Sequence, residues 1–580
     1  MLGRDYAKVL TVDLTKEKIK IDNRKDLAQW LGGVGLATKL LEEQVLPEAD
    51  PFDPDQPVVL AIGPMSTIFP VVTKVVAMFK SPLTNELGES YAGMRLAMSM
   101  RFAGYDAIVI KGKAAKPVYL SVDARGVRFK NAAGLWGLSI EDSGRLLRQM
   151  ENGSGHRSCL RIGPAGEKGV TFAGVNVDTY RHFGRLGMGA VLGQKNLKAM
   201  VVIGDREIPI ANPKEYVKVY GEIYQHVVHT EVMEKYHALG TAVNVEPLSE
   251  MQSLPTRNLQ SSTFEQVKGI SGEAFAEESL IRKMACSGCP VGCIHIGMYR
   301  RQFDEGYEYE STGVSYDYEL IYALGSLLGM GEPNKIYPLI ELVEHLGLDV
   351  ISTGVQLAWL TEALDHGLIT SEQVGTNLRF GEPEGYLKAI DNLVKQPTQL
   401  YQDLAKGTKY AAEKHGGLDF ALIAGGHEIA GYHTGYGSLL GQMVGARHSH
   451  LDNGGYSFDQ SKQVLKGEEM VDALLKEEME RCVLNSLCIC LFARKVYSLP
   501  VVSQALHSIG INLSEEDLTK LGKEIYLAKL RLKTKMNFDA SKEPIPRRFF
   551  ETPSLNGVLQ RSELEDLVDI YQQKVASLSQ

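Results

Sequence analysis

The first 207 residues carry short apolar runs separated by turn residues, a pattern typical of β-strands. The opening segment MLGRDYAKVLTVDLTKEKI alternates apolar and polar positions. Four further runs are rich in β-branched residues: VVLAIGP from Val58, YDAIVIKGK from Tyr105, PVYLSVD from Pro117 and LKAMVVIG from Leu197. Runs of this kind, bounded by Gly, Pro and Asp, predict strands. We therefore expect residues 1–207 to form a mostly β-structured domain with a few helices.

The pattern changes after Asp205. The segment DREIPIANPKEY contains two prolines, and beyond it apolar residues recur at helical spacing. In KIYPLIELVEHLGLD, Gly347 occupies the place of a helix C-cap glycine, and Asp349 lies just past the helix end. A second boundary is expected near residue 400, before the Gly- and His-rich stretch AGGHEIAGYHTGYGSLLGQMVGARHSHLDNGGYSFD. The sequence thus predicts the α+β class, with an N-terminal β-rich domain at 1–207 followed by two mainly α-helical domains at 208–400 and 401–580.

Composition and charge exclude several functional classes. Of the 580 residues, 44% are hydrophobic and 23% are charged, and the formal net charge is −9. An acidic balance argues against nucleic acid as a partner, because binding of phosphate backbones requires a basic face. The chain has no apolar run of about 18 residues and no apolar block at its start, so we expect no membrane partner and a cytoplasmic location. An odd count of seven cysteines favours free thiols or metal thiolates over disulfides.

Three of the cysteines cluster in MACSGCPVGCIHI, at Cys286, Cys289 and Cys293. The spacing C-x2-C-x3-C suits an iron–sulfur cluster loop, whose thiolates reach neighbouring corners of a cube. A structural zinc site and buried cysteines that act as small apolar residues are the alternatives. Radical-SAM enzymes use the opposite order, so their spacing excludes that class. A cluster needs a fourth ligand, and spacing alone leaves four candidates: Cys159, Cys482, Cys488 and Cys490.

Motifs along nearly the whole chain support a more specific interpretation. They include GRDYAKVLTVDLT, LGGVGLA, KSPLT, IGPAGE, FGRLGMGAVLGQKNLKAMVV, CSGCPVGC, YALGSLLG, HLGLDVISTG and PIPRRFF. With these motifs the chain resembles a divergent member of the aldehyde:ferredoxin oxidoreductase family, tungsten enzymes with two pterins and one 4Fe-4S cluster. The resemblance implies oxidation of an aldehyde to a carboxylic acid at a tungsten (or molybdenum) bis-pterin centre at the domain junction, with electrons leaving through the cluster.

The same resemblance implies the cluster ligands and part of the pterin site. The family's late D-x-x-G-L-C motif falls on NSLCIC, so Cys490 becomes the fourth ligand beside Cys286, Cys289 and Cys293. Cys488 then stands where the family has glycine, as a second thiol able to exchange with Cys490, and Asn485 replaces an aspartate expected to bind a pterin. Ile489 belongs to the same cofactor-binding motif. The sister motif EHLGLD places Glu344 and Asp349 at pterin-binding positions, although both would also suit a solvated helix end.

Further positions are implied for the pterin phosphates. RHFGRLGMG resembles the family's phosphate-facing turn, with Arg181, His182, Gly184 and Arg185 as cofactor-binding residues. A magnesium ion that bridges the phosphates is a further candidate. Lys74 stands where the family has an arginine, so a guanidinium able to form two parallel hydrogen bonds is replaced by a single ammonium group. In the cofactor loop, here SYAGM, Tyr91 stands at an asparagine position and Gly93 is retained.

The catalytic residues also follow from the resemblance. Glu319 in YDYELIYALG occupies the position of the family's base, which would deprotonate a water that attacks the carbonyl, and we expect burial to raise its pKa. Either His448 or His450 in GARHSHLDNGG would polarise or protonate the carbonyl oxygen. We favour His450, because HLD then follows the family's HLK and Asp452 replaces a pterin-contacting lysine.

Two other functions stay open, namely a reductase of activated acids or aromatic thioesters on the same scaffold, and an iron–sulfur electron-relay subunit without tungstopterin. The expected partners are a small aldehyde or acid substrate and ferredoxin or another iron–sulfur electron-transfer subunit. A homodimer is compatible with the family. Four basic residues near the cysteines would form a docking patch for an acidic ferredoxin: Arg282, Lys283, Arg300 and Arg301. Ordinary solvated charge is the alternative explanation of these residues.

Overall fold

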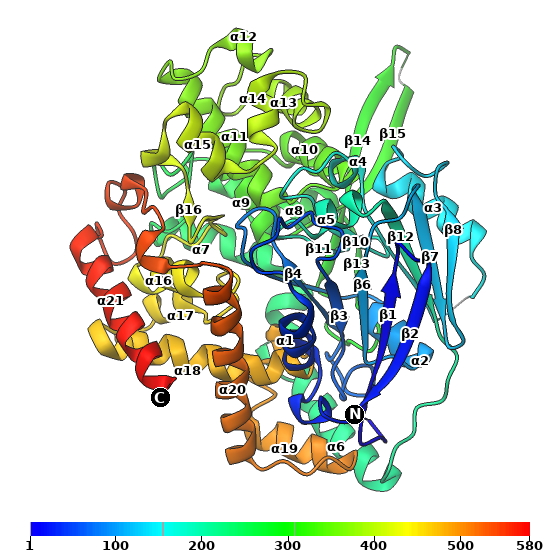
Figure 1. Ribbon diagram of the computed structural model, residues 1–580. Helices are drawn as coiled ribbons and strands as arrows, with labels where there is room; N and C mark the ends of the chain where they lie inside the picture. Colours follow the sequence, from blue (N-terminus) through cyan, green and yellow to red (C-terminus); the bar gives the residue numbers. More distant parts are fainter. Residues whose placement is uncertain (1, 154–155, 232, 307, 580) are drawn as a thin grey trace. The chain divides into compact units, whose positions relative to one another are not determined.

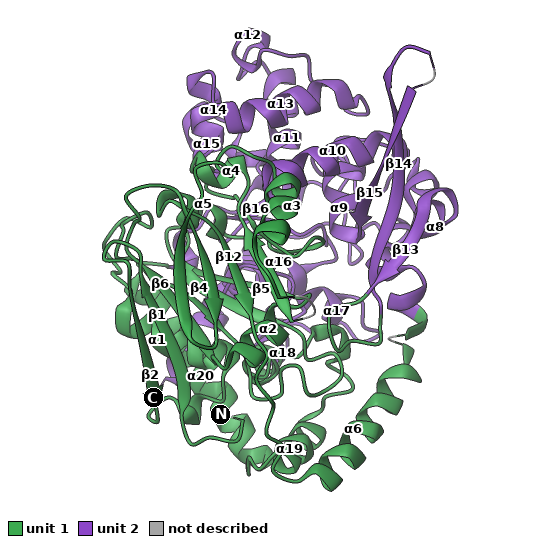
Figure 2. Ribbon diagram, turned by 90° about the vertical axis from the view of Figure 1, so that its right-hand side faces the viewer, with its two compact units in different colours: residues 1–234, 285–291, 476–538 green, residues 235–284, 292–475, 539–580 purple. Residues whose placement is uncertain are grey.

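The computed structural model describes residues 2–153, 156–231, 233–306 and 308–579. It contains two compact units, each assembled from segments that are distant in the sequence (Figure 2). Unit 1 comprises Met1–Glu234, Ala285–Val291 and Lys476–Phe538, and unit 2 comprises Lys235–Met284, Gly292–Leu475 and Asp539–Gln580. Within the described residues, no helix has the length and apolar character needed to span a bilayer.

Unit 1 is built on two six-stranded mixed sheets (Figure 1). The first has the order β2-β1-β6-β3-β4-β5, and its strands are β1 (Ala7–Asp13), β2 (Lys18–Arg24), β3 (Val58–Ala61), β4 (Val75–Lys80), β5 (Leu87–Ala92) and β6 (Ala107–Lys111). Helix α1 (Gly33–Gln44) packs on β3 and β4. Every residue of β3 and β4 is buried, which explains why these strands are continuously apolar instead of alternating.

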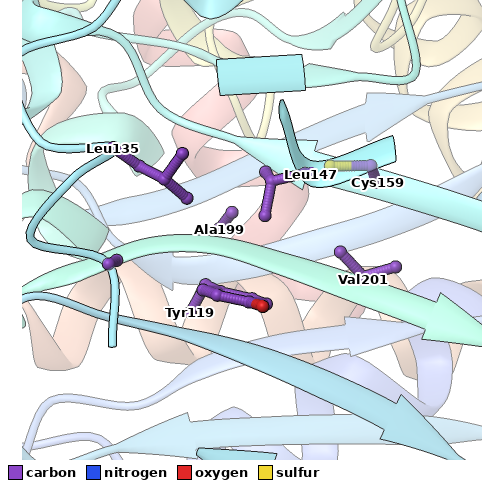
Figure 3. Packing of buried hydrophobic residues seen from close by; sticks show 7 residues of the cluster. Tyr119, Leu135, Leu147, Cys159, Ala199 and Val201 are labelled. Carbon is purple, nitrogen blue, oxygen red and sulfur yellow. The ribbon is translucent and has the colours of Figure 1, made fainter. Parts of the chain in front are cut away.

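The second sheet has the order β11-β10-β9-β12-β7-β8. Its strands are β7 (Val118–Asp123), β8 (Gly126–Asn131), β9 (Arg157–Arg161), β10 (Val175–Val177), β11 (Arg181–Phe183) and β12 (Leu197–Ile203). Cys159 lies in a core cluster with Tyr119, Leu135, Leu147 and Val201 (Figure 3). Burial raises the pKa of the Cys159 thiol, so this cysteine behaves as a small apolar core residue.

Helices complete unit 1. They are α2 (Leu96–Ala103), α3 (Ile140–Met150), α4 (Pro164–Glu167), α5 (Met188–Gln194), α6 (Pro213–Val228), α19 (Leu499–Ser508) and α20 (Glu515–Lys535). Helix α18 (Gly467–Ser486) begins in the unit 2 segment that ends at Leu475 and continues in the unit 1 segment that begins at Lys476.

Unit 2 is mainly helical. Its helices include α7 (Val245–Glu250), α8 (Gly272–Ser279), α9 (Tyr318–Leu324), α10 (Pro333–Leu346), α11 (Val350–Asp365), α13 (Pro383–Lys395), α14 (Gln399–Leu404), α15 (Thr408–His415), α16 (Tyr436–Val444), α17 (Gly455–Asp459) and α21 (Arg561–Leu578). A three-stranded antiparallel sheet has the order β13-β14-β15, with β13 (Leu280–Met284), β14 (Ile294–Asp304) and β15 (Glu308–Tyr316). A short hairpin pairs β16 (Ile423–Ala424) with β17 (His427–Glu428).

The structure confirms the α+β class and the predicted strands, which are β1, β3, β6, β7 and β12. It also confirms the predicted helix end, because α10 stops at Leu346 and Gly347 follows with a φ of +77°. Glycine adopts this left-handed conformation without steric cost. The division into three domains near residues 207 and 400 stays a prediction.

Candidate functional site

The predicted site residues are distributed over both units. Those in unit 1 are Lys74, Tyr91, Gly93, Arg181, His182, Gly184, Arg185, Cys286, Cys289, Asn485, Ile489 and Cys490, and those in unit 2 are Cys293, Glu319, Glu344, Asp349, His448, His450 and Asp452. Among the described residues, no three His, Cys, Asp or Glu side chains converge as ligands of a single metal ion.

In unit 1, the peptide group of Val71 joins two of the predicted cluster segments. Its N–H donates to the carbonyl of Gly288 at 3.2 Å, and its carbonyl accepts the N–H of Cys490 at 3.1 Å. Gly288 lies in the turn in which the N–H of Cys289 donates to the carbonyl of Cys286 at 3.1 Å. One loop residue thus holds the segment of Cys286 and Cys289 beside the segment of Cys490, about two hundred residues apart in the chain.

The surroundings of Cys286 favour a thiolate. Burial alone would raise the pKa of this thiol, but the positive charges of Lys74 and Arg181 outweigh burial and lower it, with help from hydrogen bonds of Met94 and Thr73. A lowered pKa suits a thiol that serves as a metal ligand. Gly93 allows this arrangement, since a Cβ atom at that position would lie only 2.6 Å from Sγ of Cys286. Lys74, Gly93 and Arg181 therefore surround a predicted cluster ligand.

Cys488 has a different environment from Cys286. Its side chain is fully buried, its Sγ lies 3.9 Å from the carbonyl oxygen of Ala61, and burial raises its pKa to about 12. Its φ is +64°, in a turn after α18 where its own N–H donates to Asn485 and that of Ile489 donates to Leu484. This left-handed position suits the glycine that the resemblance places here. A protonated thiol that points to Ala61 does not support the predicted exchange with Cys490.

The structure explains two of the glycines in the turn RHFGRLGMG. Gly187 has a φ of +84°, and a Cβ there would lie 1.9 Å from the carbonyl oxygen of Thr171. A Cβ at Gly189 would lie 2.2 Å from the carbonyl oxygen of Gly174. Close backbone packing thus requires both residues. Gly184 is different, because the nearest atom to a Cβ there is 3.9 Å away, so packing does not demand glycine at this predicted cofactor position.

The other predicted residues of this turn lie on β11 or just after it. Arg181 and His182 are in β11, and Arg185 follows before α5. Burial lowers the pKa of His182 to about 3, with smaller contributions from the charges of Arg181 and Arg161. Its Nε2 lies 2.9 Å from Nδ2 of Asn176. A neutral imidazole accepts this amide hydrogen bond through Nε2.

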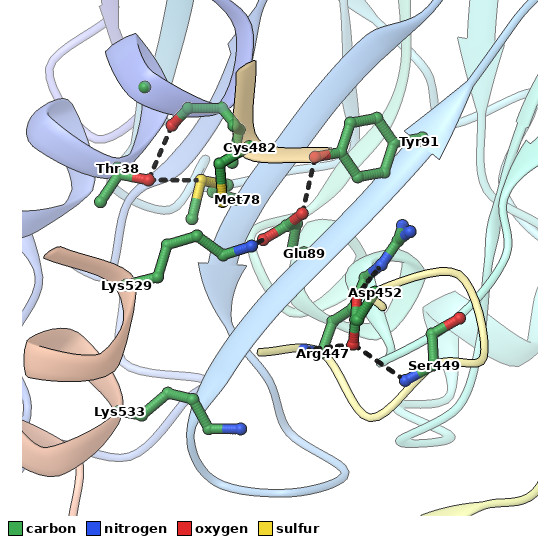
Figure 4. A network of polar contacts seen from close by, with 12 residues as sticks. Thr38, Met78, Glu89, Tyr91, Arg447, Ser449, Asp452, Cys482, Lys529 and Lys533 are labelled. Carbon is green, nitrogen blue, oxygen red and sulfur yellow. Dashed lines mark hydrogen bonds and ion pairs between the residues drawn. The ribbon is translucent and has the colours of Figure 1, made fainter. Parts of the chain in front are cut away.

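Tyr91 contacts a buried ion pair in unit 1. Its hydroxyl donates to Oε1 of Glu89 at 2.6 Å, and Nζ of Lys529 lies 2.7 Å from Oε2 of the same carboxylate (Figure 4). Both charged side chains are almost completely buried. The tyrosine that stands at the family's asparagine position is therefore oriented by a carboxylate on its own strand, β5.

In unit 2, two of the predicted catalytic residues, Glu319 and His450, lie within contact distance of each other. Nε2 of His450 lies 3.3 Å from Oε1 of Glu319, in the first turn of α9. The hydroxyl of Tyr432 donates to the same oxygen at 3.1 Å. The ring of Tyr432 is 4.8 Å from that of His450 and 4.7 Å from that of Tyr456. We call Glu319, His450 and Tyr432 the Glu319 cluster.

The pKa expected for Glu319 was wrong in direction. Burial, the largest single effect, raises the pKa of this carboxyl, but the hydrogen bond and charge of His450, a backbone hydrogen bond and the Tyr432 hydroxyl together lower it. Glu319 is therefore a carboxylate at neutral pH and is able to accept a proton. Burial raises the pKa of Tyr432 well above 10, so its hydroxyl stays protonated and serves as a donor.

The two candidate histidines have different partners. Nδ1 of His448 lies 3.1 Å from the carbonyl oxygen of Gln442, and His448 itself has a φ of +55°. Asp452 closes the loop that carries both histidines. It accepts hydrogen bonds from Nε of Arg447 at 2.6 Å and from the N–H groups of Arg447 and Ser449 at 3.0 and 3.1 Å. This geometry favours His450 as the partner of Glu319.

The predicted pterin carboxylates of unit 2 have structural partners as well. Asp349 is the N-cap of α11 and accepts the N–H groups of Ile351 and Ser352 at 3.3 and 3.1 Å. Glu344 lies near the end of α10, and its Oε1 accepts the hydroxyl of Ser315 at 3.4 Å. Helix capping accounts for Asp349 without a ligand, so its pterin-binding role stays a prediction.

Sequence analysis missed Tyr432 and Tyr456. Both follow glycines, in GYHTGYGSLL and NGGYSFD, and neither segment carries a chemical motif. The only signal is that aromatic residues flank the His-rich segment on both sides. Such a signal is weak, because tyrosines near glycines are common in ordinary loops.

Comparison with known proteins assigns the chain to a class of enzymes. The family model described as "Aldehyde ferredoxin oxidoreductase, N-terminal domain" matches residues 9–204, and that described as "Aldehyde ferredoxin oxidoreductase, domains 2 & 3" matches residues 218–574. The protein is an oxidoreductase of the aldehyde ferredoxin oxidoreductase type. The chain belongs to the aldehyde ferredoxin oxidoreductase family.

Individual relatives agree with this assignment. The tungsten-containing aldehyde ferredoxin oxidoreductase of Pyrococcus horikoshii is 31% identical over 577 residues, which cover 95% of this chain and 92% of that protein. The enzyme of the same name from Thermococcus kodakarensis is 31% identical, with 95% and 93% covered. The WOR-like subunit of an aliphatic sulfonate oxidoreductase from Pyrococcus furiosus is 32% identical over 427 residues, with 70% and 67% covered.

A solved structure shows the same fold. The active site complex BamBC of benzoyl coenzyme A reductase, in complex with 1,5 dienoyl-CoA, superposes with a TM-score of 0.83 over 98% of this chain and 94% of that chain. Sequence identity is 20%. At that identity the similarity establishes the architecture and leaves the reaction to the site residues.

Proposed function

We propose that the protein oxidises an aldehyde to a carboxylic acid at a tungsten bis-pterin centre and passes the electrons through a 4Fe-4S cluster to ferredoxin. In the balanced reaction, one aldehyde and one water give one carboxylic acid, two protons and two electrons. The relatives that match nearly the full chain carry this activity in their names. The observation that carries the proposal is the Glu319 cluster, an acid–base group with a half-buried carboxylate and a buried imidazole at two positions expected from the sequence.

The residues of unit 1 fit the cofactors. The lowered pKa of Cys286 suits a thiolate ligand, and Val71 hydrogen-bonds both Gly288, in the same loop as Cys286, and Cys490. With Cys289 and Cys293 these residues would hold the cluster. Arg181, Arg185 and Lys74 would neutralise pterin phosphates. When bound, the tungsten centre supplies the two-electron redox chemistry that amino-acid side chains lack.

The protein's own residues would handle the protons. Glu319 is ionised and would accept a proton from the water that attacks the carbonyl carbon. His450 lies 3.3 Å away and would share that proton and hydrogen-bond the carbonyl oxygen. Tyr432 keeps its own proton and would hold the carboxylate of Glu319 in one orientation. Burial of the group would limit access of other water molecules.

Replacement of Glu319 by Gln tests the assignment. In protein made by a host that builds the cofactor, E319Q should lose aldehyde-dependent reduction of a viologen dye and keep the tungsten and iron content of the wild type. The matched control is Glu384→Gln, at an exposed position of α13, which should keep full activity. Full activity of E319Q would refute its role as base.

Metal analysis separates this proposal from the electron-relay alternative. About one tungsten or molybdenum atom per chain would exclude a relay subunit without tungstopterin. The viologen assay run in both directions, with an aldehyde or with an activated acid or thioester, distinguishes an oxidase from a reductase.

A further inference from the structure

The segment with the three clustered cysteines connects two strands of an antiparallel sheet. Strand β13 (Leu280–Met284) ends two residues before Cys286, and β14 (Ile294–Asp304) begins directly after Cys293. Strand β15 (Glu308–Tyr316) pairs with β14 along its length. The predicted cluster loop is therefore directly connected, through the chain, to two strands of this sheet.

Strand register separates the sheet into two faces, because paired residues share a face and neighbours along a strand alternate. On the inner face, Gly297 packs so closely on α10 that a Cβ would lie 1.9 Å from the hydroxyl of Tyr337. Arg301 also lies on this face, where it pairs with Glu310, its cross-strand neighbour, and approaches Glu341 of α10 at 3.8 Å. The inner face is thus packed around Gly297, and its exposed Arg301 is neutralised by Glu310.

On the outer face, Arg282 of β13 lies opposite Ile296 of β14. The next residues of β14 on this face are Met298, Arg300 and Gln302, and Gln302 pairs with Tyr309 of β15. We call Arg282, Met298, Arg300 and Tyr309 the outer patch. Met298 and Tyr309 are 45% and 40% exposed, and the guanidinium of Arg300 lies over the ring of Tyr309 at 4.2 Å. Exposed methionine, tyrosine and arginine together are typical of the centre of a protein–protein interface.

The outer patch is positively charged. Between Met284 and the Gln302–Tyr309 pair, the residues that share this face include two arginines and no carboxylate. The carboxylates of the hairpin lie elsewhere, either in the Arg301–Glu310 pair or near the tip beyond the register shift, at Asp304, Glu305 and Glu308. The charge of this face is complementary to that of an acidic partner.

We propose that the outer patch is the docking surface for an acidic iron–sulfur electron carrier of the ferredoxin type, an inference that rests on the proposed function. Arg282 and Met298 are four and five residues from Cys286 and Cys293. At a rise of about 3.3 Å per residue, Arg282 lies within roughly 13 Å of Cys286 and Met298 within roughly 17 Å of Cys293, so the patch begins close to the predicted cluster ligands. The patch differs from the four basic residues expected from sequence, because Arg301 is neutralised on the other face and Met298 and Tyr309 take part.

Charge reversal on the patch tests the proposal. In the holoenzyme with both Arg282→Glu and Arg300→Glu, the KM for an acidic 4Fe-4S ferredoxin should rise by about tenfold or more at low ionic strength. The same variant should lose most of the salt dependence of this KM. Viologen-coupled aldehyde oxidation should keep the wild-type rate, because the dye needs no docking surface. The control pair Lys388→Glu and Lys462→Glu changes the net charge equally at exposed positions outside this sheet.

The outcomes distinguish the two proposals. A wild-type KM for ferredoxin in the Arg282/Arg300 variant, or an equal rise in the control pair, would overturn the docking surface. Absence of viologen-coupled oxidation in the wild type would overturn the proposed function alone. In that event, direct titration calorimetry of the same ferredoxin with wild type and variant tests the surface, and equal affinities would overturn it.

Discussion

The chemistry of the Glu319 cluster depends on which atom holds each proton. Oε1 of Glu319 receives the hydroxyl of Tyr432 at 3.1 Å and faces Nε2 of His450 at 3.3 Å. Both partners stabilise the carboxylate against the cost of burial, and the pKa is lowered as a result. A base with a low pKa is a weak base, but one that is already deprotonated over the whole neutral range. Activity should therefore decline only when acid protonates the carboxylate.

Tyr432→Phe changes this balance by one hydrogen bond. Because the phenol lowers the pKa of Glu319, its removal should raise that pKa and move the acidic limb of the kcat/KM profile to higher pH. A hydrogen bond to a charged group is worth about 1.5 to 3 kcal/mol, so a shift of about one to two pH units is expected. The pH profile of viologen-coupled oxidation measures this shift.

The control for this prediction is Tyr456→Phe. The ring of Tyr456 packs against that of Tyr432 at 4.7 Å, and its replacement by Phe keeps that ring contact while it removes a different hydroxyl. Its acidic limb should stay at the wild-type position. An unchanged limb in Tyr432→Phe would show that the phenol does not set the protonation of Glu319.

At the scale of elements, the turn after α18 decides which thiol can be a cluster ligand. The left-handed Cys488 directs its side chain to Ala61 in the interior, and the next turn residues return the backbone to Val71 through the N–H of Cys490. Glycine at position 63 allows this turn to approach, since a Cβ there would lie 2.5 Å from the carbonyl oxygen of Ser486. The two neighbouring cysteines are therefore not equivalent.

Substitution of each cysteine by alanine tests this difference. Cys488→Ala should keep the iron and sulfide content and the electron paramagnetic resonance signal of the reduced cluster, with a loss of stability of about 1 to 2 kcal/mol from the buried sulfur. Cys490→Ala should lose iron or shift the cluster signal, because a 4Fe-4S cluster is held by four thiolates. Equal iron loss in both variants would contradict the assignment.

The fold was predictable from sequence where local chemistry decides it. The strands at Val58 and Leu197 and the helix end at Gly347 follow from apolar runs, turn residues and the left-handed preference of glycine. Sheet order was not predictable, because strand neighbours such as β1 and β6 are about a hundred residues apart. The sequence pattern also could not decide whether Asp349 caps a helix or binds a ligand. Both roles use a carboxylate at the same place beyond a helix end.

The site was predictable only through whole motifs. The resemblance named Glu319 and His450 as separate candidates, but their contact and the contribution of Tyr432 depend on a loop conformation that leaves no periodic trace. The direction of the pKa of Glu319 depends on the balance between burial and hydrogen bonds, and only coordinates give that balance.

At the scale of the whole molecule, unit 1 depends on contacts between the two ends of the chain. Its first sheet comes from residues before 112, whereas α20 lies beyond residue 514. Two buried lysines of α20 bind carboxylates of the first sheet region, Lys529 to Glu89 at 2.7 Å and Lys533 to Glu86 at 3.3 Å. During synthesis, the buried carboxylates Glu86 and Glu89 therefore gain their lysine partners only after most of the chain has been made.

The Lys529–Glu89 pair allows a quantitative test of this dependence. Lys529→Met leaves a buried carboxylate without its cation, and the free energy of unfolding should fall by about 3 to 5 kcal/mol. Adding Glu89→Gln removes the uncompensated charge and keeps an acceptor for Tyr91, so the double variant should recover most of that loss. Guanidinium denaturation of the wild type, Lys529→Met, Glu89→Gln and the double variant gives the coupling energy. Strictly additive effects would mean that the pair does not hold α20 to the sheet, and packing of α20 on α1 would then have to supply the connection.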